Sequence, residues 1–433
     1  MYIKRKSAKY IKKVIEKESS VILIGTRQVG KTTLLKKIEG DFVSEGKKTF
    51  YFNLELPSSL NIFSSGVEGF LEYIRARGAG NIKDSSKKVY VFIDEFQYIV
   101  SAGKFLKALI DNFPSIKIIA SGSSSVEIQK SMEESLVGRK RIIRIFPLNF
   151  EEFLYFNKAQ EAEFFTKLNI HHPLKPALSN RFEELFYQFV VWGGMPRVVL
   201  EEDYQERREI LEDVCSSYLQ KDIKGLLGSE NIAAFNKLMI LLAQESSSLL
   251  SLNSMSGILG IKRAELERHL FILENTFVNF LLPSFFTNKR KELSKIRKSF
   301  FYDTGIRNYL VKDLSRVQER FDKGKLLESA VYNEFSKDKK AGMELYHWRT
   351  QHQTEIDFVI KYDNKIIPVE VKSGTLNHVP MAVSSFAKQY KSPFAVVINK
   401  DYWSEEIVKG LKVYFMPFFL ACFIPGLVMG GES

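Results

Sequence analysis

The sequence predicts an α/β fold in its N-terminal part, mainly helical segments in its middle and an α+β unit in its C-terminal part. Between about residues 20 and 146, five short apolar runs alternate with helical stretches. This alternation indicates a parallel sheet that is covered on both faces. Helical periodicity dominates residues 147–283. Beyond about residue 320, a helical stretch precedes two apolar runs joined by a polar turn, which is typical of a helix followed by a β-hairpin.

The composition suits a soluble protein of two to four domains, because 433 residues with 45% hydrophobic content can bury several cores. The net charge of +12 favours polyanionic partners, nucleic acid first and anionic membranes second. The two cysteines, Cys215 and Cys422, have no metal-ligand spacing, which suits a reducing cytoplasm. The apolar run 413–429 is interrupted by Pro417 and Pro425. We therefore expect a buried strand and a docked tail there, and no membrane anchor.

A phosphate-binding loop is predicted by the stretch GTRQVGKT at residues 25–32. The stretch follows an apolar strand and opens a helix, which is the context that the motif of glycine, four residues and Gly-Lys-Thr requires. Its glycines let the backbone point N–H groups at phosphate oxygens. Lys31 would reach the β- and γ-phosphates, and the Thr32 hydroxyl would ligate Mg²⁺. Nucleotide contacts are expected from Gly25, Thr26, Arg27, Gln28, Val29, Gly30, Lys31, Thr32 and Thr33.

The acidic partner of this loop is expected at the end of the strand VYVFIDE. Asp94 would hold the Mg²⁺ shell, and Glu95 would polarise the attacking water. With both motifs at the ends of predicted strands, the sequence predicts a nucleotide-binding protein. Ser121 and Ser123, at the end of the next strand, would lie near the γ-phosphate. Arg139 has two interpretations: an arginine that reaches a γ-phosphate in trans, or part of a basic surface run.

A helix-turn-helix is predicted over residues 253–276, with its turn at Gly260-Ile261. The apolar stripe of the second helix consists of Leu266, Leu270, Leu273 and Phe277, and basic residues lie outside it or follow it. These basic residues are Lys262, Arg263, Arg268, Lys289, Arg290, Lys291, Lys295, Arg297 and Lys298. The pattern indicates either a winged helix whose basic strand pair binds DNA phosphates, or a lid module with a solvated charged face.

The stretch EIDFVIKYDNKIIPVEVKSG, residues 355–374, predicts a hairpin with a two-residue turn. That register sets Asp357 opposite Glu370, with Lys372 on the same face. Opposed like charges destabilise a sheet, so either a cation neutralises the pair or the register is wrong. The alternative is a surface ion pair between Glu355 and Lys372, with Asp357 facing solvent.

The motifs GTRQVGKTTLL, FIDEFQY, ASGSSS, LVGRKRIIRIFPLNFEEFL and GGMPRVV together resemble prokaryotic AAA+ ATPases of the archaeal-ATPase-like group. Members of this group carry a C-terminal domain of unknown function with a restriction-endonuclease-like core. The likeness continues through SSYLQKDI, YDTGIRNYL and GKLLESAVYNEF into the hairpin, and so covers nearly the whole chain. It implies a P-loop AAA+ core at 1–146, a helical lid at 147–230, a winged-helix segment at 231–318 and a PD-(D/E)XK nuclease-like domain at 319–433.

The same resemblance implies the chemistry of both sites. In PD-(D/E)XK sites two carboxylates hold a divalent cation that activates water, while a lysine offsets developing charge. The likeness assigns these parts to Asp357, Glu370 and Lys372, adds Glu328 from the preceding helix, and implies Mg²⁺ or Mn²⁺ there. It further implies an ATPase that uses Mg²⁺. The net charge and the basic middle segment favour action on DNA, the cysteine usage suits the cytoplasm, and an arginine acting in trans would make the protein a homo-oligomer. The alternatives are a regulatory NTP switch with an inactive nuclease-like interaction module, and a transcription-factor-like binder that hydrolyses ATP incidentally.

Overall fold

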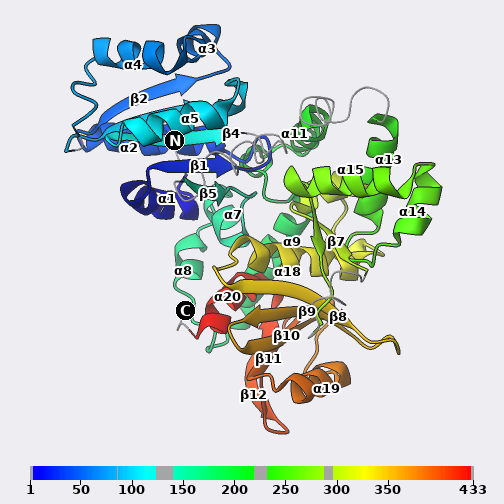
Figure 1. Ribbon diagram of the computed structural model, residues 1–433. Helices are drawn as coiled ribbons and strands as arrows, with labels where there is room; N and C mark the ends of the chain where they lie inside the picture. Colours follow the sequence, from blue (N-terminus) through cyan, green and yellow to red (C-terminus); the bar gives the residue numbers. More distant parts are fainter. Residues whose placement is uncertain (1–2, 85, 123–139, 219–231, 287–295, 431–433) are drawn as a thin grey trace. The chain divides into compact units, whose positions relative to one another are not determined.

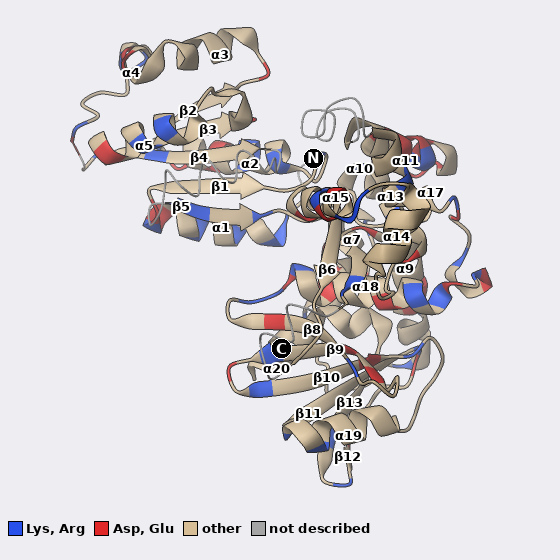
Figure 2. Ribbon diagram, turned by 45° about the vertical axis from the view of Figure 1, so that its right-hand side comes forward, with Lys and Arg blue, Asp and Glu red and all other residues tan. Residues whose placement is uncertain are grey.

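The computed structural model describes residues 3–84, 86–122, 140–218, 232–286 and 296–430. The chain divides into two compact units, and each is described by itself. The first consists mainly of Met1–Phe146, and the second contains nearly all of the remaining chain (Figure 1). Lysine, arginine and acidic residues lie on helices of both units (Figure 2). The finer division into four domains stays a prediction.

The N-terminal unit is built on a parallel sheet whose strands follow the order β2-β3-β4-β1-β5. The sheet pairs are parallel throughout, as the alternating pattern predicted. Because β1 and β3 are buried along their whole length, they need apolar side chains on both faces. The strands are β1 (Ser20–Ile24), β2 (Lys48–Asn53), β3 (Val89–Asp94), β4 (Ile116–Gly122) and β5 (Lys140–Arg144).

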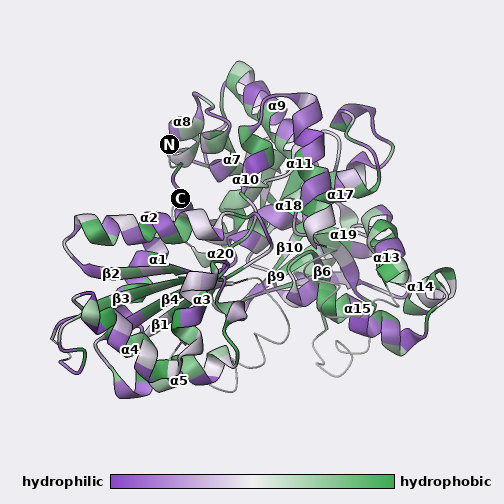
Figure 3. Ribbon diagram, turned by 90° about the horizontal axis from the view of Figure 1, so that it is seen from above, coloured by the Kyte–Doolittle hydropathy of each residue, from purple (hydrophilic) through white to green (hydrophobic). Residues whose placement is uncertain are grey.

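Helices cover both faces of this sheet. One face is covered by α1 and α2 and the other by α3, α4 and α5 (Figure 3). Their bounds are α1 (Lys6–Lys17), α2 (Lys31–Ser44), α3 (Pro57–Ser64), α4 (Gly66–Ala76) and α5 (Ala102–Asn112). The layering confirms the predicted α/β fold and brings the carboxyl ends of β1, β3 and β4 to one edge.

The C-terminal unit begins with helices. They are α7 (Phe150–Phe156), α8 (Ala162–Thr166), α9 (Pro176–Trp192), α10 (Pro196–Leu200), α11 (Tyr204–Ser217), α13 (Ile232–Gln244), α14 (Leu252–Leu259) and α15 (Arg263–Asn275). The predicted turn between α14 and α15 is present, with Gly260 at a φ of 66°. Leu266, Leu270 and Leu273 are buried as predicted. Phe277 is buried too, but it lies beyond the end of α15 and so is not on the helical stripe.

A two-stranded antiparallel sheet follows α15, formed by β6 (Asn279–Leu282) and β7 (Lys298–Phe301). After it come α17 (Thr304–Leu310) and α18 (Lys323–Lys337). The strand pair was predicted to be basic and to face solvent. That prediction is wrong for β7, whose four residues are all buried.

The last part of the chain forms a six-stranded mixed sheet of order β12-β13-β11-β10-β9-β8. Its strands are β8 (Met343–Arg349), β9 (Glu355–Tyr362), β10 (Lys365–Val371), β11 (Phe394–Asn399), β12 (Ser404–Val408) and β13 (Leu411–Pro417), with α19 (Met381–Tyr390) packed against it. The β9–β10 hairpin has the predicted two-residue turn and register, from Lys365↔Tyr362 to Val369↔Phe358. After β13 the apolar tail packs as a buried 3-10 turn and the short helix α20 (Ile424–Met429). No helix in the described part of the chain is long and apolar enough to cross a membrane.

Candidate nucleotide site and carboxylate cluster

The loop between β1 and α2 takes its shape from two glycines. A Cβ at Gly25 would lie 2.1 Å from the carbonyl oxygen of Ile145, so only glycine fits there. Gly30 precedes α2 with a φ of 91°, a conformation that L side chains rarely adopt. The loop therefore brings its backbone close to the start of α2, where unpaired N–H groups favour an anion.

Lys31 is the first residue of α2, and its side chain turns back into the loop. The residue is only 5% exposed, and its Nζ donates hydrogen bonds to the carbonyl oxygens of Gly25 and Thr26, both at 2.8 Å. The buried hydroxyl of Thr26 makes no hydrogen bond to any part of the chain that the structure describes. A cationic side chain thus lies in the predicted phosphate loop and donates to two carbonyl oxygens of the loop itself.

Arg5 supports this loop and was missed by the sequence reasoning. It precedes α1 and is 7% exposed. Its Nη1 donates to the carbonyl of Val29 at 3.0 Å, and its Nη2 donates to the carbonyl of Phe146 at 2.8 Å. The arginine thereby joins the loop to the segment after β5. In the sequence it belongs to an ordinary basic run, Lys4-Arg5-Lys6, so no local signal distinguishes it.

The predicted acidic residue, Asp94, ends β3 and is 1% exposed. Because β4 lies between β3 and β1, Ser121 of β4 stands beside Leu23 of the loop strand. The Ser121 hydroxyl donates to Oδ1 of Asp94, and the Tyr51 hydroxyl donates to Oδ2 at 3.1 Å. Neighbouring strands therefore bring Ser121 and Asp94 together at the edge that carries the loop.

Tyr51 is the second residue that the sequence reasoning missed. Burial and the charge of Asp94 raise the pKa of Tyr51, which keeps its hydroxyl a hydrogen-bond donor. A signal was available: Asn53 pairs with Asp94 in the parallel register, and Tyr51 lies two residues earlier on the same face of β2. Detecting it requires knowing that β2 lies beside β3.

The other predicted residues of this site have the following positions. Glu95 follows β3 with a φ of 56°, and it accepts a hydrogen bond from the side chain of Gln97. Thr32 and Thr33 lie in the first turn of α2, and Arg27 and Gln28 lie partly exposed in the loop. Arg139 and Ser123 lie outside the described residues.

A second site, which we call the carboxylate cluster, consists of Glu328 on α18, Asp357 on β9 and Glu370 on β10 together with Lys298 and Lys372. Asp357 is 7% and Glu370 4% exposed. The ladder between β9 and β10 ends at Phe358↔Val369, after which the backbone N–H of Val371 donates to Oδ2 of Asp357 at 2.9 Å. The structure thus brings together the three acids that the sequence predicted.

Lys298 is the residue of this cluster that the sequence reasoning assigned wrongly. It was predicted to belong to a basic DNA-binding face, but it is 4% exposed on β7. Its Nζ lies 2.9 Å from Oε1 of Glu328 and 3.7 Å from Oδ1 of Asp357. Ser247 donates to the other oxygen of Glu328 at 3.0 Å. A short strand with four buried residues gives no alternation from which its facing could be predicted.

The proposed surface ion pair of the hairpin is also corrected. Lys372 lies 2.6 Å from Oε1 of Glu370, while Glu355 pairs with Arg349 at 3.5 Å. Asp357 is buried and does not face solvent. Lys298 and Lys372 are therefore both paired with acids of the predicted nuclease motif. The predicted ion pair between Glu355 and Lys372 is not formed, because each of these residues has another partner.

The charges of the carboxylate cluster shift one another's protonation. Burial and the charge of Asp357 raise the pKa of Glu328 to about 8 and that of Glu370 to about 7. Burial alone would lower the pKa of Lys298, but Glu328 and Asp357 raise it above its ordinary value. Among the described residues, no three His, Cys, Asp or Glu side chains are arranged to hold a metal ion. The cluster is held together by ammonium groups.

The resembling motifs GGMPRVV and YDTGIRNYL pack against each other. Asp303 caps α17 by accepting from the backbone N–H of Ile306, and it also accepts from the N–H of Gly194 at 2.7 Å. A Cβ at Gly193 would collide with the carboxylate of Asp303, and one at Gly305 would collide with the backbone of Trp192. These glycines allow α9 and α17 to approach, so the two motifs have a structural explanation.

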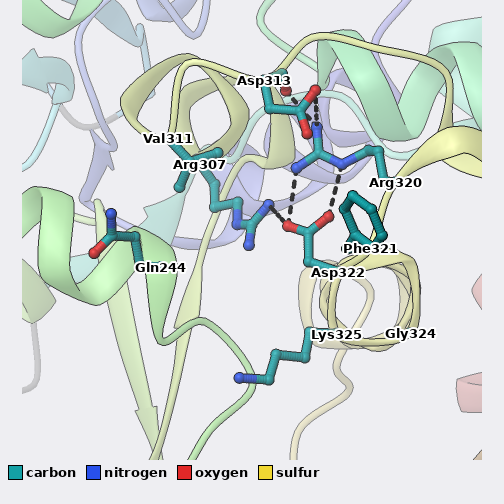
Figure 4. Close-up of a pocket in the computed structure, with 9 residues that line it drawn as sticks. All are labelled: Gln244, Arg307, Val311, Asp313, Arg320, Phe321, Asp322, Gly324 and Lys325. Carbon is teal, nitrogen blue, oxygen red and sulfur yellow. Dashed lines mark hydrogen bonds and ion pairs between the residues drawn. The ribbon is translucent and has the colours of Figure 1, made fainter.

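A pocket of about 580 Å³ lies beside α18 and is lined by Gln244, Arg307, Val311, Asp313, Arg320, Phe321, Asp322, Gly324 and Lys325 (Figure 4). Arg320 binds both oxygens of Asp322, at 2.8 and 2.9 Å, and Arg307 binds one at 2.6 Å. Although burial opposes it, these two guanidinium groups lower the pKa of Asp322 to about 2. The arginines thus fix the start of α18, the helix that carries Glu328.

Comparison with known proteins agrees with the geometry of the N-terminal unit. Residues 17–154 match the family model described as an AAA domain. The N-terminal unit has the α/β fold and the parallel sheet that match a P-loop ATPase core. Residues 183–317 and 323–419 match two models described as domains of unknown function, DUF8612 and DUF4143.

Relatives cover most of the chain at low identity. An uncharacterized protein of Haemophilus influenzae is 22% identical over 406 residues, which is 91% of this chain and 92% of that protein. An uncharacterized protein of Methanocaldococcus jannaschii is 26% identical over 354 residues, covering 79% of this chain and 72% of that protein. A solved structure of a Walker-type ATPase of Pyrococcus abyssi is 15% identical, with a TM-score of 0.47, covering 71% of this chain and 96% of that one.

Proposed function

We propose that this chain binds ATP with Mg²⁺ and hydrolyses the γ-phosphate. The observation that carries the proposal is a shared position: Lys31, in the glycine-shaped loop after β1, and the Asp94–Ser121 pair, at the carboxyl ends of β3 and β4, lie at the same edge of one parallel sheet. Mg²⁺ would be held by Thr32 and Asp94, where it would neutralise phosphate charge. The oxygen donors suit a hard cation.

The residues of the site divide the work among them. Lys31 would exchange its two neutral carbonyl partners for phosphate oxygens, because hydrogen bonds between charged groups are the stronger ones. Tyr51 and Ser121 orient Asp94 by donating to its two oxygens. Glu95 would orient the attacking water as the general base, and Ser121 would contact the γ-phosphate.

The test measures ATP binding and phosphate release separately. Lys31→Ala should lower turnover by about 10²–10³-fold, the range for losing one donor to a developing anion. Glu95→Gln should lower kcat by about 10²–10⁴-fold while ATP still binds, because it removes only the base. Lys37→Ala, a lysine of the same helix that pairs with Asp41, is the matched control and should behave as the wild type. Unchanged turnover in Lys31→Ala would remove the assignment.

Action on DNA is the finer part of the proposal, together with assembly through Arg139 in trans and residence in the cytoplasm. The support for DNA is the net charge and the exposed basic residues Lys262 and Arg268 near the turn of α14 and α15. Figure 2 shows both signs of charge on α15, and there Arg263 pairs with Glu267 at 2.9 Å. Because α15 carries Glu265, Glu267 and Glu274 beside its two arginines, the helix itself has no net positive charge.

DNA affinity should fall steeply with salt, because bound phosphates release counterions. Lys262→Glu combined with Arg268→Glu should weaken binding and flatten the salt dependence. Lys158→Glu combined with Lys167→Glu, at two exposed residues outside the helix-turn-helix, is the control for net charge, because it changes the charge by the same amount. Equal loss of affinity in the control would show that total charge, and no local face, accounts for binding.

A second candidate is a regulatory NTP switch whose nuclease-like domain, α18 with the β9–β10 sheet, is catalytically inactive. The observation that favours it is the position of Lys298 between Glu328 and Asp357. Nicking of supercoiled DNA with Mg²⁺ or Mn²⁺ separates the two. Nicking that Asp357→Asn abolishes would support an active nuclease, whereas ATP hydrolysis without any nicking would support the switch.

A further inference from the structure

The carboxylate cluster already contains a cation of its own. The ammonium of Lys298 reaches Glu328 from β7, a strand that lies outside the helix and hairpin that carry the acids. The side chain is 5% exposed. An ammonium at this depth is costly unless it is paired, and here it is paired on two sides.

We infer that Lys298, and no divalent metal, is the resident cation of the carboxylate cluster, so that the nuclease-like unit is closed by its own β7 strand. A divalent ion bound to Glu328 and Asp357 would stand about 2.0–2.6 Å from an oxygen of each. The ammonium nitrogen lies 2.9 Å and 3.7 Å from those same carboxylates. A divalent ion on these same oxygens would lie beside the ammonium, and two positive charges so close together in a buried site repel each other strongly.

The remaining oxygens of the cluster are also occupied by the protein. Ser247 donates to Glu328, the N–H of Val371 donates to Asp357, and Lys372 pairs with Glu370. Only Oε2 of Glu370 is buried without a hydrogen bond to the residues that the structure describes. Mg²⁺ requires six ligands and Ca²⁺ six to eight, so one remaining oxygen does not make a metal cage. The donor set therefore does not fit the metal that the nuclease resemblance implies.

The inference has a consequence for how the C-terminal unit is built. Lys298 ties the strand pair that follows α15 to α18 and to β9, so the acids serve as an ionic joint between three elements. Removing the ammonium would leave three acids facing one another with only Lys372 at their edge. A divalent cation would then be the remaining way to neutralise them. The site is thus one substitution away from binding a metal.

The experiment is a titration of the nucleotide-free full chain with MnCl₂, followed by calorimetry and thermal melting. The variants are Lys298→Met, Asp357→Asn, Lys298→Met combined with Asp357→Asn, and Lys372→Met. Lys372 is the matched control, because its ammonium pairs with Glu370 alone and its side chain is 46% exposed. Nucleotide is left out because it would bring metal to the P-loop.

We expect the wild type and Lys372→Met to bind no Mn²⁺ and to melt at the same temperature with and without it. Lys298→Met should melt lower than the wild type without metal, and Mn²⁺ should raise its Tm by several degrees, since the ion binds only the native state. Asp357→Asn should remove that gain. Mn²⁺ binding by the wild type that Asp357→Asn abolishes would overturn the inference, and so would a folded Lys298→Met that neither melts lower nor binds Mn²⁺. Should Lys298→Met fail to fold, the wild-type titration alone decides. None of these results depends on ATP hydrolysis.

Discussion

Two buried lysines, one in each unit, make the most instructive comparison in this protein. Lys31 and Lys298 are 5% and 4% exposed, and each ammonium lies near two oxygens of its own chain. The hydrogen bonds that the structure describes for the Lys31 ammonium go to the carbonyls of Gly25 and Thr26. The partners of Lys298 are the carboxylates of Glu328 and Asp357. The two lysines are equally buried, but the described oxygens near Lys31 are neutral carbonyls and those near Lys298 belong to carboxyl groups.

That difference separates a site that can take a ligand from one that is complete. A neutral carbonyl can give up its ammonium to a phosphate, because the new bond is charge-assisted. A buried carboxylate cannot lose its ammonium without being left as an uncompensated charge, which costs about 3–5 kcal/mol. A lysine in a motif is therefore informative only together with the groups that it contacts.

The largest expected effect is on stability. Lys298→Met should lower the free energy of unfolding of the C-terminal unit by about 3–5 kcal/mol, as expected for a broken buried ion pair. Lys31→Met should cost the N-terminal unit only about 1–2 kcal/mol, since it loses hydrogen bonds to neutral oxygens. All three tryptophans, Trp192, Trp348 and Trp403, lie in the C-terminal unit. Urea unfolding followed by tryptophan fluorescence therefore reports Lys298→Met, and circular dichroism reports both.

The proposed difference between the two lysines would be wrong if Lys298→Met and Lys31→Met lowered the free energy of unfolding by the same amount. An equal loss would mean that Glu328 and Asp357 hold the ammonium of Lys298 no more tightly than the loop carbonyls hold that of Lys31. Lys372→Met supplies the control within the same cluster. Its ammonium is half exposed, so its loss should cost about 1 kcal/mol or less.

A smaller effect concerns pH and the neighbouring His347 on β8. Burial, and next the positive charge of Lys298, lower the pKa of His347 to about 4. The unfolded chain binds this proton near pH 6.5 and the folded chain only near pH 4, so stability is lost as the pH falls through that window. The loss amounts to about 3.5 kcal/mol at most, for about 2.5 pKa units at about 1.4 kcal/mol each.

The measurement is the difference in unfolding free energy between the wild type and His347→Gln at several pH values. The variant serves as reference because Glu328 and Glu370, with raised pKa values, change stability in the opposite sense as the pH rises from about 4.5 to 8. In Lys298→Met, the pH range over which His347 changes the stability should become narrower, since the pKa of His347 rises when the neighbouring positive charge is removed. An unchanged pH range would show that the charge of Lys298 does not affect the pKa of His347.

The fold was predictable where a pattern is local. Apolar runs predicted the five parallel strands, and the turn at Asp363 predicted the hairpin register, which the structure confirms. Glycine spacing indicated a loop that the backbone does form around Gly25. The three acids of the cluster lie within about forty residues of sequence. Two of them lie on the two strands of one hairpin, whose register fixes their relative position, and the third lies on the helix that precedes this hairpin.

The rest depends on contacts between distant segments. Lys298 lies 30 residues before Glu328 and belongs to a different pair of strands, so its charge suggested a solvated basic face. Arg5 acts on the loop from before the first helix, at Val29, and on Phe146. A sequence shows which charges exist, but the burial of a charge is decided by how the strands pack, and that packing cannot be read from a four-residue strand.

The smallest predicted effect tests how Asp94 is held at the sheet edge that also carries the phosphate loop. Tyr51→Phe removes one donor to Asp94 and leaves Ser121, so the carboxylate keeps one partner. We expect the affinity for Mg²⁺-ATP to weaken by about 1 kcal/mol, a factor of about five, as for the loss of one hydrogen bond. The KM for Mg²⁺-ATP should rise while kcat stays near the wild-type value, because Tyr51 orients the acid and does not contact the attacking water. Ser121→Ala is the matched variant, and it should also lower kcat, since Ser121 would contact the γ-phosphate. If Tyr51→Phe lowered kcat as strongly as Ser121→Ala does, the hydroxyl of Tyr51 would act in the reaction itself. It would then do more than orient the carboxylate of Asp94.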